Sequence, residues 1–343
     1  MKRFIIKLAI FLIPVFLVIL GFFVLDPFKI FYRYSNYSQN MYVILNRDYV
    51  STEVFKANAP RYRYNSFILG SSRTLAYQVP DWQTHLDSGA RPFKFDASGE
   101  TIFGIYTKIK YLHEKGVDMK NVLLIFCPDV TFSKEGDYDG MLLIKHPEVA
   151  QTSKLRFYLQ FLKSYIDPKF LESYYTYRVT GKFYPFMDGI LESRHILFDT
   201  VTNNLSITDQ DVALRNDPEK YYAERKPIFY TRQSANSATT DTISQKQLAM
   251  LREMKAIFDE HHTNSKIVIS PLYDQKKMNA RSVQEISDIF GASNVADFSG
   301  VNEFTADYNN YYEASHYRPH VGAAIMNRIY NTPAAPVLAQ KRN

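Results

Sequence analysis

Five short apolar runs alternate with helix-like segments along this chain, and this alternation constrains the fold more than any other feature. The runs are typical of buried β-strands because turn-forming or charged residues bound them. They lie at residues 65–69, 92–97, 122–126, 266–270 and 294–298. Segments with helical spacing lie between or after them, at residues 99–115, 245–261, 282–290 and 320–330. The alternation predicts an α/β fold, with a doubly wound, flavodoxin-like parallel sheet of five strands and helices on both faces.

Residues 130–242 interrupt this alternation, and we predict one long, mostly helical insertion there. Residues 155–166 and 170–179 are aromatic and helix-like. Aromatic side chains at helical spacing could stack on sugar rings, but the pattern favours a role in the core. The α/β domain is therefore predicted to span residues 65–331, with a frayed tail at residues 332–343.

The N-terminus carries basic residues followed by an uncharged apolar run at residues 8–25. At about 1.5 Å per residue, a helix of roughly 18 residues nearly crosses a hydrocarbon core of about 30 Å. A cleaved signal peptide is the alternative, but no small-x-small site follows the run. We therefore predict a transmembrane signal anchor over residues 1–26 and a juxtamembrane strap over residues 27–64. The basic N-terminus favours a cytoplasmic end. This predicts a single-pass protein of the cytoplasmic or inner membrane, with most of the chain periplasmic or on the cell surface.

Charge and cysteine content exclude some classes of protein. The formal net charge is +6, and no arginine-rich block or nucleic-acid motif concentrates it. We expect no nucleic-acid partner, although the charge suits an anionic membrane or envelope polymer nearby. Cys127 is the single cysteine, so an intrachain disulfide cannot form. No histidine-carboxylate set has the spacing of a metal site, and we predict neither a metal nor another cofactor.

Two serines follow the first predicted strand, in the stretch Gly70-Ser71-Ser72-Arg73. In doubly wound sheets, ligands bind at the carboxyl ends of the strands. A serine at the start of the following helix lies near backbone N–H groups and the positive end of the helix dipole, which stabilise negative charge. The ordinary alternative is a helix N-cap in a glycine-serine turn. From these residues alone, either serine is a candidate nucleophile.

Two further elements could complete a nucleophilic site. Glu313 and His316 are three residues apart, and a helical turn would bring them to the same side. The carboxylate could hold one imidazole nitrogen while the other takes a serine proton, or the two could form a solvated ion pair. Gly99, which follows the second strand, could offer its backbone N–H to an oxyanion. The alternative there is an ordinary helix start with Ser98 as its cap.

Serine, glycine and acid-x-x-histidine in this order resemble the SGNH (GDSL-type) hydrolase superfamily. The resemblance covers about residues 65–126 and 265–330. The Gly-Asp-Ser block of the family matches Gly70-Ser71-Ser72, which places Ser72 at the nucleophile position and Ser71 at that of a non-catalytic aspartate. The oxyanion glycine of the family matches Gly99.

The last block of the family, Asp-x-x-His, matches Glu313 and His316, with glutamate in place of aspartate. Its third block, Gly-x-Asn-Asp, is absent, because Phe126-Cys127-Pro128-Asp129 stands in that place. The asparagine that donates to the oxyanion hole is therefore missing or replaced. Loss of one such donor typically costs about a hundred- to a thousandfold in rate.

The resemblance implies a serine esterase or O-acyltransferase with a Ser-His-Glu triad. Ser72 would attack, His316 would act as base and then acid, and Glu313 would orient His316. The N–H groups of Ser72 and Gly99 would form the oxyanion hole.

The closer likeness is to membrane-anchored teichoic-acid D-alanine transfer proteins and polysaccharide O-acetyltransferases. It implies an acyl group, most simply acetyl, on a cell-envelope polysaccharide, and a membrane-bound O-acyltransferase as partner. Arg73 and Asp129 are candidate substrate-binding residues. Arg73 could instead pair with a carboxylate such as Asp96 or Glu313. The alternative function is a catalytically weak glycan-binding or scaffold partner of the membrane-bound enzyme.

Overall fold

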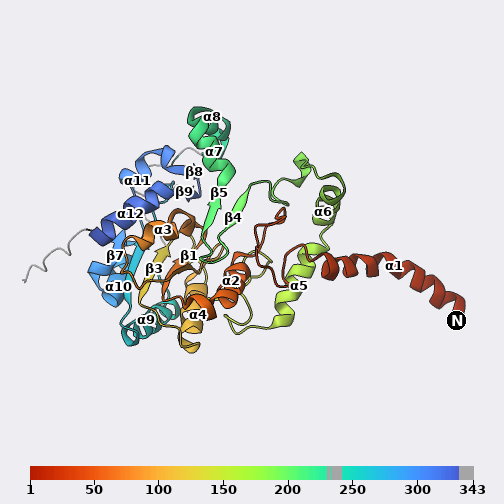
Figure 1. Cartoon of the computed structure of the whole chain (residues 1–343), viewed down its shortest axis with the longest axis horizontal. Helices are drawn as coiled ribbons and strands as arrows, with labels where there is room; N and C mark the ends of the chain where they lie inside the picture. The colour runs from red at the N-terminus through yellow and green to blue at the C-terminus, as the bar shows by residue number, and fades with distance from the viewer. Residues whose placement is uncertain (230–231, 233–241, 332–343) are drawn as a thin grey trace, which may run out of the picture.

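The computed structural model describes residues 1–229, 232 and 242–331, and Figure 1 shows the arrangement of its elements. The helices and strands that bear on the site are α1 (Lys2–Leu25), α2 (Arg47–Tyr62), β1 (Ser66–Gly70), the 3₁₀ helix η1 (Ser72–Ala76), α3 (Val79–Gln83), β2 (Pro92–Lys94), α4 (Ile102–Glu114), β3 (Asn121–Phe126), α5 (Lys154–Tyr165), α6 (Pro168–Thr180), β4 (Ile196–Phe198), β5 (Leu205–Ile207), α7 (Thr208–Asn216), α8 (Pro218–Arg225), α9 (Gln245–Glu260), β6 (Asn264–Ile269), α10 (Ala280–Phe290), β7 (Val295–Asp297), β8 (Tyr311–Glu313), β9 (His316–Tyr317) and α12 (Pro319–Asn331).

The central sheet has five parallel strands in the order β2-β1-β3-β6-β7. The predicted α/β fold and its five strands are therefore confirmed, in the doubly wound order of flavodoxin-like sheets. From β1 the chain builds toward β2 on one side and then toward β3 on the other. This reversal opens a crevice at the carboxyl ends of β1 and β3, where such folds bind their ligands.

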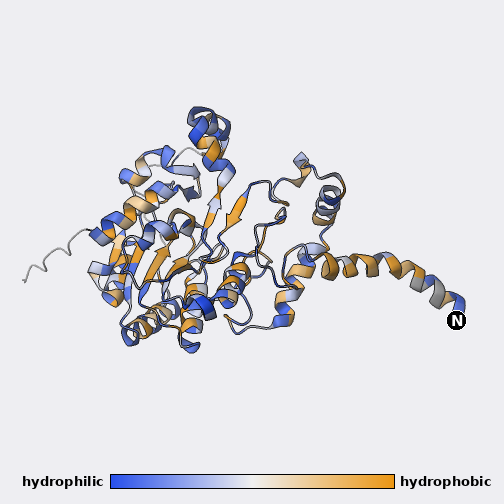
Figure 2. Ribbon diagram, in the orientation of Figure 1, coloured by the Kyte–Doolittle hydropathy of each residue, from blue (hydrophilic) through white to orange (hydrophobic). Residues whose placement is uncertain are grey.

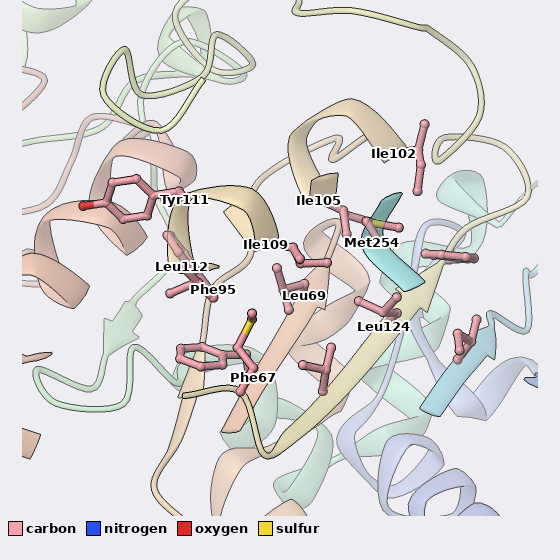
Figure 3. Packing of buried hydrophobic residues seen from close by; sticks show 14 of the residues in the cluster. Phe67, Leu69, Phe95, Ile102, Ile105, Ile109, Tyr111, Leu112, Leu124 and Met254 are labelled. Atoms are coloured by element: carbon pink, nitrogen blue, oxygen red, sulfur yellow. The ribbon is translucent and has the colours of Figure 1, made fainter. Parts of the chain in front are cut away.

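Two hydrophobic layers cover the sheet, because successive side chains of a strand point to opposite faces. Phe67 and Leu69 pack with α4, α9 and α10, whereas Ile68 packs with α3 and α12. Figure 3 shows the first layer, where Leu69 and Leu124 lie among Ile105, Ile109 and Met254. Figure 2 shows the central strands as strongly hydrophobic, as expected for strands buried on both faces.

The insertion contains the helices α5 to α8, but fewer than half of its described residues are helical, so the prediction of a mostly helical segment is only partly right. It also contains the antiparallel hairpin β4–β5, which was not expected. A loop of this hairpin covers the edge strand β2. The Lys94 N–H donates to the Thr202 carbonyl at 2.9 Å, and Asn203 Nδ2 donates to the Lys94 carbonyl at 2.7 Å. An otherwise open sheet edge is thereby paired by the insertion. β4 and β5 are as short as β2 and β7, but no alternation with segments of helical spacing marks them in the sequence, which is why they were not predicted.

Helix α1 extends away from the α/β body in Figure 1, and its C-terminal end packs against the insertion. Phe22 is buried there against Phe28, Phe31 and Tyr165. Within the part of the chain that the structure describes, no helix combines the length and the hydropathy needed to cross a membrane. The predicted transmembrane anchor is therefore not supported. The predicted frayed tail at residues 332–343 lies outside the described residues.

Candidate active site

Ser72 is the first residue of η1 and directly follows the turn that ends β1. Gly70 makes this turn with a φ of 154°, and a Cβ there would lie 2.6 Å from the Ile125 carbonyl oxygen on β3. Only glycine fits so close to the neighbouring strand. The predicted helix after Ser72 is a five-residue 3₁₀ turn, followed by α3. Dipole stabilisation at Ser72 is therefore smaller than a long helix would give.

Ser72, His316 and Glu313 form one chain of hydrogen bonds, as predicted. His316 Nδ1 bonds Glu313 Oε1, and His316 Nε2 lies 2.8 Å from Ser72 Oγ. A carboxylate only accepts, so Nδ1 carries the hydrogen and Nε2 accepts from the serine hydroxyl. The Ser315 N–H donates to Glu313 Oε2 at 2.6 Å. Burial raises the pKa of Glu313, but the hydrogen bonds and charge of His316 and Ser315 outweigh it and hold that pKa below 4.5.

The backbone that carries Glu313 and His316 differs from the expected helical turn. The two residues are antiparallel partners across the hairpin β8–β9, so pairing across a tight turn brings them together. Tyrosines of the insertion hold this hairpin. The Tyr221 hydroxyl donates to the Tyr312 carbonyl at 3.0 Å, and the Tyr222 hydroxyl donates to the Tyr311 carbonyl at 2.9 Å.

Arg73 links the nucleophile turn to the histidine hairpin. Its Nη1 and Nη2 donate to the two Asp129 carboxylate oxygens at 2.7 and 2.8 Å, and its Nε donates to the Ser315 carbonyl at 2.9 Å. Ser315 lies directly before His316, so this fork fixes the loop that presents the imidazole. Arg73 and Asp129 were candidates for substrate binding. The structure pairs them with each other, and not with Asp96 or Glu313.

Ser71, the rival nucleophile, points away from the triad. Its side chain is 2 % exposed, and its Oγ lies 3.1 Å from Cys127 Sγ. The same oxygen accepts the Arg73 N–H at 3.4 Å, which is the helix-capping contact that serine commonly makes. The geometry therefore separates the two serines, with Ser71 as the cap and Ser72 at the histidine.

The proposed oxyanion donors lie on adjacent loops at the carboxyl edge of the sheet. The Ala97 N–H donates to the Gly70 carbonyl at 3.2 Å, which places the loop after β2 beside the nucleophile turn. Gly99 follows with a φ of 55°, in the left-handed region that favours glycine. Ser98 also lines the cavity beside Ser72. The loop after β3, where the family has its asparagine donor, carries Asp129 instead. Both oxygens of the Asp129 carboxylate accept hydrogen bonds from Arg73.

A cavity of about 230 Å³ lies against the triad. Ser72, Glu313 and His316 line one part of it. The loop after β2 adds Asp96 and Ser98, and segments outside the predicted catalytic blocks form most of the rest. Its apolar walls come from the strap, η1 and the insertion. These residues are Met41, Ile44, Leu45, Leu75, Ile196, Phe198, Leu205 and Ile207. Sequence reasoning missed all of them, because single apolar residues in loops and three-residue strands carry no periodic signal.

Charged groups of the cavity wall form ion pairs with each other. Arg47 Nη2 binds Asp96 Oδ1, and the other Asp96 oxygen accepts the Thr74 hydroxyl at 2.6 Å. Arg194 Nη2 donates to Glu192 Oε2 at 2.8 Å. The Arg47–Asp96 contact joins α2 to the loop after β2, whereas the Arg194–Glu192 pair is local to the insertion.

No group of three or more histidine, cysteine, aspartate or glutamate side chains able to hold a metal lies among the described residues. The absence of a metal or cofactor in the working protein stays a prediction. In comparisons with known proteins, no family model matches this chain and no curated protein matches it.

Proposed function

We propose that this chain is a serine esterase or O-acyltransferase of the SGNH type. The observation that carries the proposal is the hydrogen-bonded sequence Ser72–His316–Glu313, with 2.8 Å between the serine oxygen and the imidazole. A serine hydroxyl is a weak nucleophile unless a base takes its proton, and a third group must orient that base. The three side chains meet both requirements at the crevice where the sheet order reverses.

In the proposed acylation step, Ser72 Oγ attacks the carbonyl carbon of an ester while His316 Nε2 accepts the hydroxyl proton. Glu313 holds Nδ1–H and stabilises the imidazolium. The hydrogen bonds of the described residues leave the Ser72 N–H without an acceptor, so it can donate to the oxyanion, with Gly99 as the proposed second donor. The intermediate collapses as His316 returns the proton to the leaving alkoxide, which gives an acyl-Ser72 and a free alcohol.

In the proposed second step, His316 takes a proton from an incoming hydroxyl, which attacks the acyl-Ser72 carbonyl. The bond from the carbonyl carbon to Ser72 Oγ then breaks, and His316 returns the proton to the serine oxygen. Water as the acceptor gives an esterase, and a sugar hydroxyl gives an acyltransferase. The two activities therefore share one covalent intermediate.

The proposed substrate is an O-acyl group on a cell-envelope polysaccharide, outside the cytoplasm. A membrane-bound O-acyltransferase is the proposed source of acyl groups. The support for this part is the resemblance of the Gly-Ser-Ser block and the altered third block to envelope-modifying relatives. The size of the acyl group is a separate question.

The alternative, a scaffold that holds glycan without catalysis, predicts a separated serine and histidine. A distance of 2.8 Å between Ser72 and His316 weighs against it. The altered third block favours slower catalysis, because the Asp129 carboxylate binds Arg73 and cannot donate a hydrogen bond to the oxyanion as an asparagine would.

A fluorophosphonate probe tests the proposal, because it modifies only activated serines and needs no acyl acceptor. We expect the full chain to be labelled. Labelling should be lost in Ser72→Ala and His316→Ala and retained in Ser71→Ala, the matched control one residue away. Absence of labelling in a well-folded wild-type protein would overturn the proposed enzyme and favour the scaffold.

A further inference from the structure

The cavity beside Ser72 is larger than an acetyl group requires. Its volume is about 230 Å³. A water-sized group takes about 30 Å³ in the liquid, so the space holds roughly seven or eight such groups. An acetyl group would fill only the part nearest the nucleophile. The remainder would stay as apolar space beside the substrate.

The β4–β5 hairpin supplies the wall by simple alternation. Ile196 pairs with Ile207 and Phe198 pairs with Leu205 across the two strands, and all four side chains line the cavity. Leu197, between the two β4 residues, points to the opposite face and is 47 % exposed. One face of the hairpin is therefore directed at the catalytic serine.

Charge gives a second constraint on the occupant. The wall carries Arg47 paired with Asp96 and Arg194 paired with Glu192, and the Glu313 carboxylate is held by His316 and Ser315. Arg47 Nη1 is the exception, since it has no hydrogen-bond partner among the described residues. A charged group would have to compete with these existing pairs. The apolar majority of the wall favours an uncharged, hydrocarbon occupant.

We propose that this cavity binds the acyl part of the substrate and selects an unbranched, uncharged chain of roughly four to eight carbons over acetyl. This inference rests on the proposed function, because it assigns the cavity to the acyl group that Ser72 carries. Burial of one methylene group is worth about a fourfold gain in binding. The gain should accumulate until the chain reaches the end of the cavity.

The test uses p-nitrophenyl acetate, butyrate, hexanoate and octanoate with the full chain. The release of p-nitrophenolate on acylation is followed, so the result does not depend on which acceptor removes the acyl group. We expect the acylation kcat/KM to rise from acetate to butyrate by on the order of tenfold, which corresponds to two methylene groups. We expect it to reach its maximum between butyrate and octanoate.

Two matched variants locate this preference in the hairpin. Leu205→Phe adds bulk to the cavity wall and should lower kcat/KM for hexanoate and octanoate about tenfold or more relative to kcat/KM for acetate. Leu197→Phe makes the same change on the solvent face of the hairpin and should leave the whole chain-length profile unchanged. Fluorophosphonate labelling of both variants reports whether the triad is intact.

Different results overturn the inference and the proposed function. Ser72-dependent turnover that is fastest with acetate and falls with each added carbon would overturn the acyl-chain inference and leave the enzyme intact. An identical profile in Leu205→Phe and Leu197→Phe, with labelling retained, would also overturn it. Absence of Ser72-dependent acylation by every ester, together with absence of labelling, would overturn both.

Discussion

The parallel sheet and the segments added to it make different contributions to the site. The sheet presents Ser72 after β1, the loop with Gly99 after β2 and Asp129 after β3. The strap and the insertion add no member of the triad, but they supply most of the apolar wall of the cavity. We infer that the sheet determines which reaction is possible, and that the added segments determine which acyl group takes part.

The two regions also differ in how they are held. The proposed catalytic groups are held by charge-assisted contacts at strand ends, such as Arg73 with Asp129. The cavity wall is fixed by apolar packing and by the loop that pairs with β2. Substitutions in the first region should therefore change the rate, and substitutions in the second should change selectivity or stability.

The His316→Ala substitution should separate the role of the sheet region in the reaction from the role of the cavity in binding most clearly. Removal of the general base should lower the acylation rate about 10⁴-fold or more, because the triad acts as a unit. Binding of an unreactive amide analogue with the same acyl chain should stay near wild type, since the β4–β5 hairpin that lines the cavity is untouched. His320→Ala, a nearby histidine that bonds Asn310, is the control and should leave the rate near wild type. Loss of analogue binding in His316→Ala would show that the two regions are not separable.

Glu313→Gln tests the charge behind His316 without changing its shape. We expect the acylation rate to fall about 10²- to 10⁴-fold, because the imidazolium loses its carboxylate partner. The effect on stability should depend on pH, since His316 and Ser315 hold the pKa of Glu313 below 4.5 despite its burial.

A lowered folded pKa means that the unfolded chain takes up the proton first as the pH falls. The stability that Glu313 contributes is therefore fully present above the ordinary pKa and is lost as the pH falls through the folded value. The difference in free energy of unfolding between wild type and Glu313→Gln should shrink as the pH is lowered below about 5. A difference that does not change with pH would contradict the account of Glu313.

Arg73→Lys tests the link between the two catalytic loops. A lysine ammonium cannot reproduce a fork that holds both Asp129 oxygens and the Ser315 carbonyl at once. We expect kcat to fall about 10- to 100-fold with little change in KM, since misplaced catalytic groups slow the reaction more than they weaken binding. Arg61→Lys on the exposed face of α2 is the control. A rise in KM at unchanged kcat would contradict this positioning role and would indicate that Arg73 binds the substrate.

Lys94 lies where the two regions meet and should give the smallest effect. Its side chain is fully buried, and its Nζ has no hydrogen-bond partner among the described residues. Burial is the main cause that lowers its pKa to about 7, against the attraction of Asp96. We expect Lys94→Met to raise the free energy of unfolding by about 1–4 kcal/mol at pH 7 or below.

The pH dependence of this stability difference follows from proton uptake by Lys94. Between pH 7 and 10.5 the unfolded chain binds more protons than the folded chain, so wild-type stability rises with pH relative to the variant. The advantage of Lys94→Met should be greatest below pH 7 and should vanish above pH 10.5. Denaturant unfolding across this range measures it, and an advantage that is equal at pH 7 and pH 10 would contradict the assignment.

The sequence predicts the sheet region well, because its apolar runs alternate with segments of helical spacing, even where the strand itself has only three residues, as in β2 and β7. It also brings Ser72, Glu313 and His316 together correctly, although the backbone behind the last two is a hairpin and not a helical turn. The roles of Arg73 and Asp129 depend on side-chain directions that spacing does not reveal. The strands of the hairpin β4–β5 are close in sequence, but the position of the hairpin depends on contacts with distant segments such as β2, so the cavity could not be predicted.

The most direct test of the account is the position of the acyl group in the covalent intermediate. The full chain would be mixed with p-nitrophenyl butyrate, quenched in acid and digested with trypsin, which releases residues 64–73 as one peptide with three serines. Fragmentation of that peptide by mass spectrometry assigns the added butyryl mass to one of them. We predict that the mass lies on Ser72. Its presence on Ser71, or its absence from the peptide while p-nitrophenolate is released, would contradict the account.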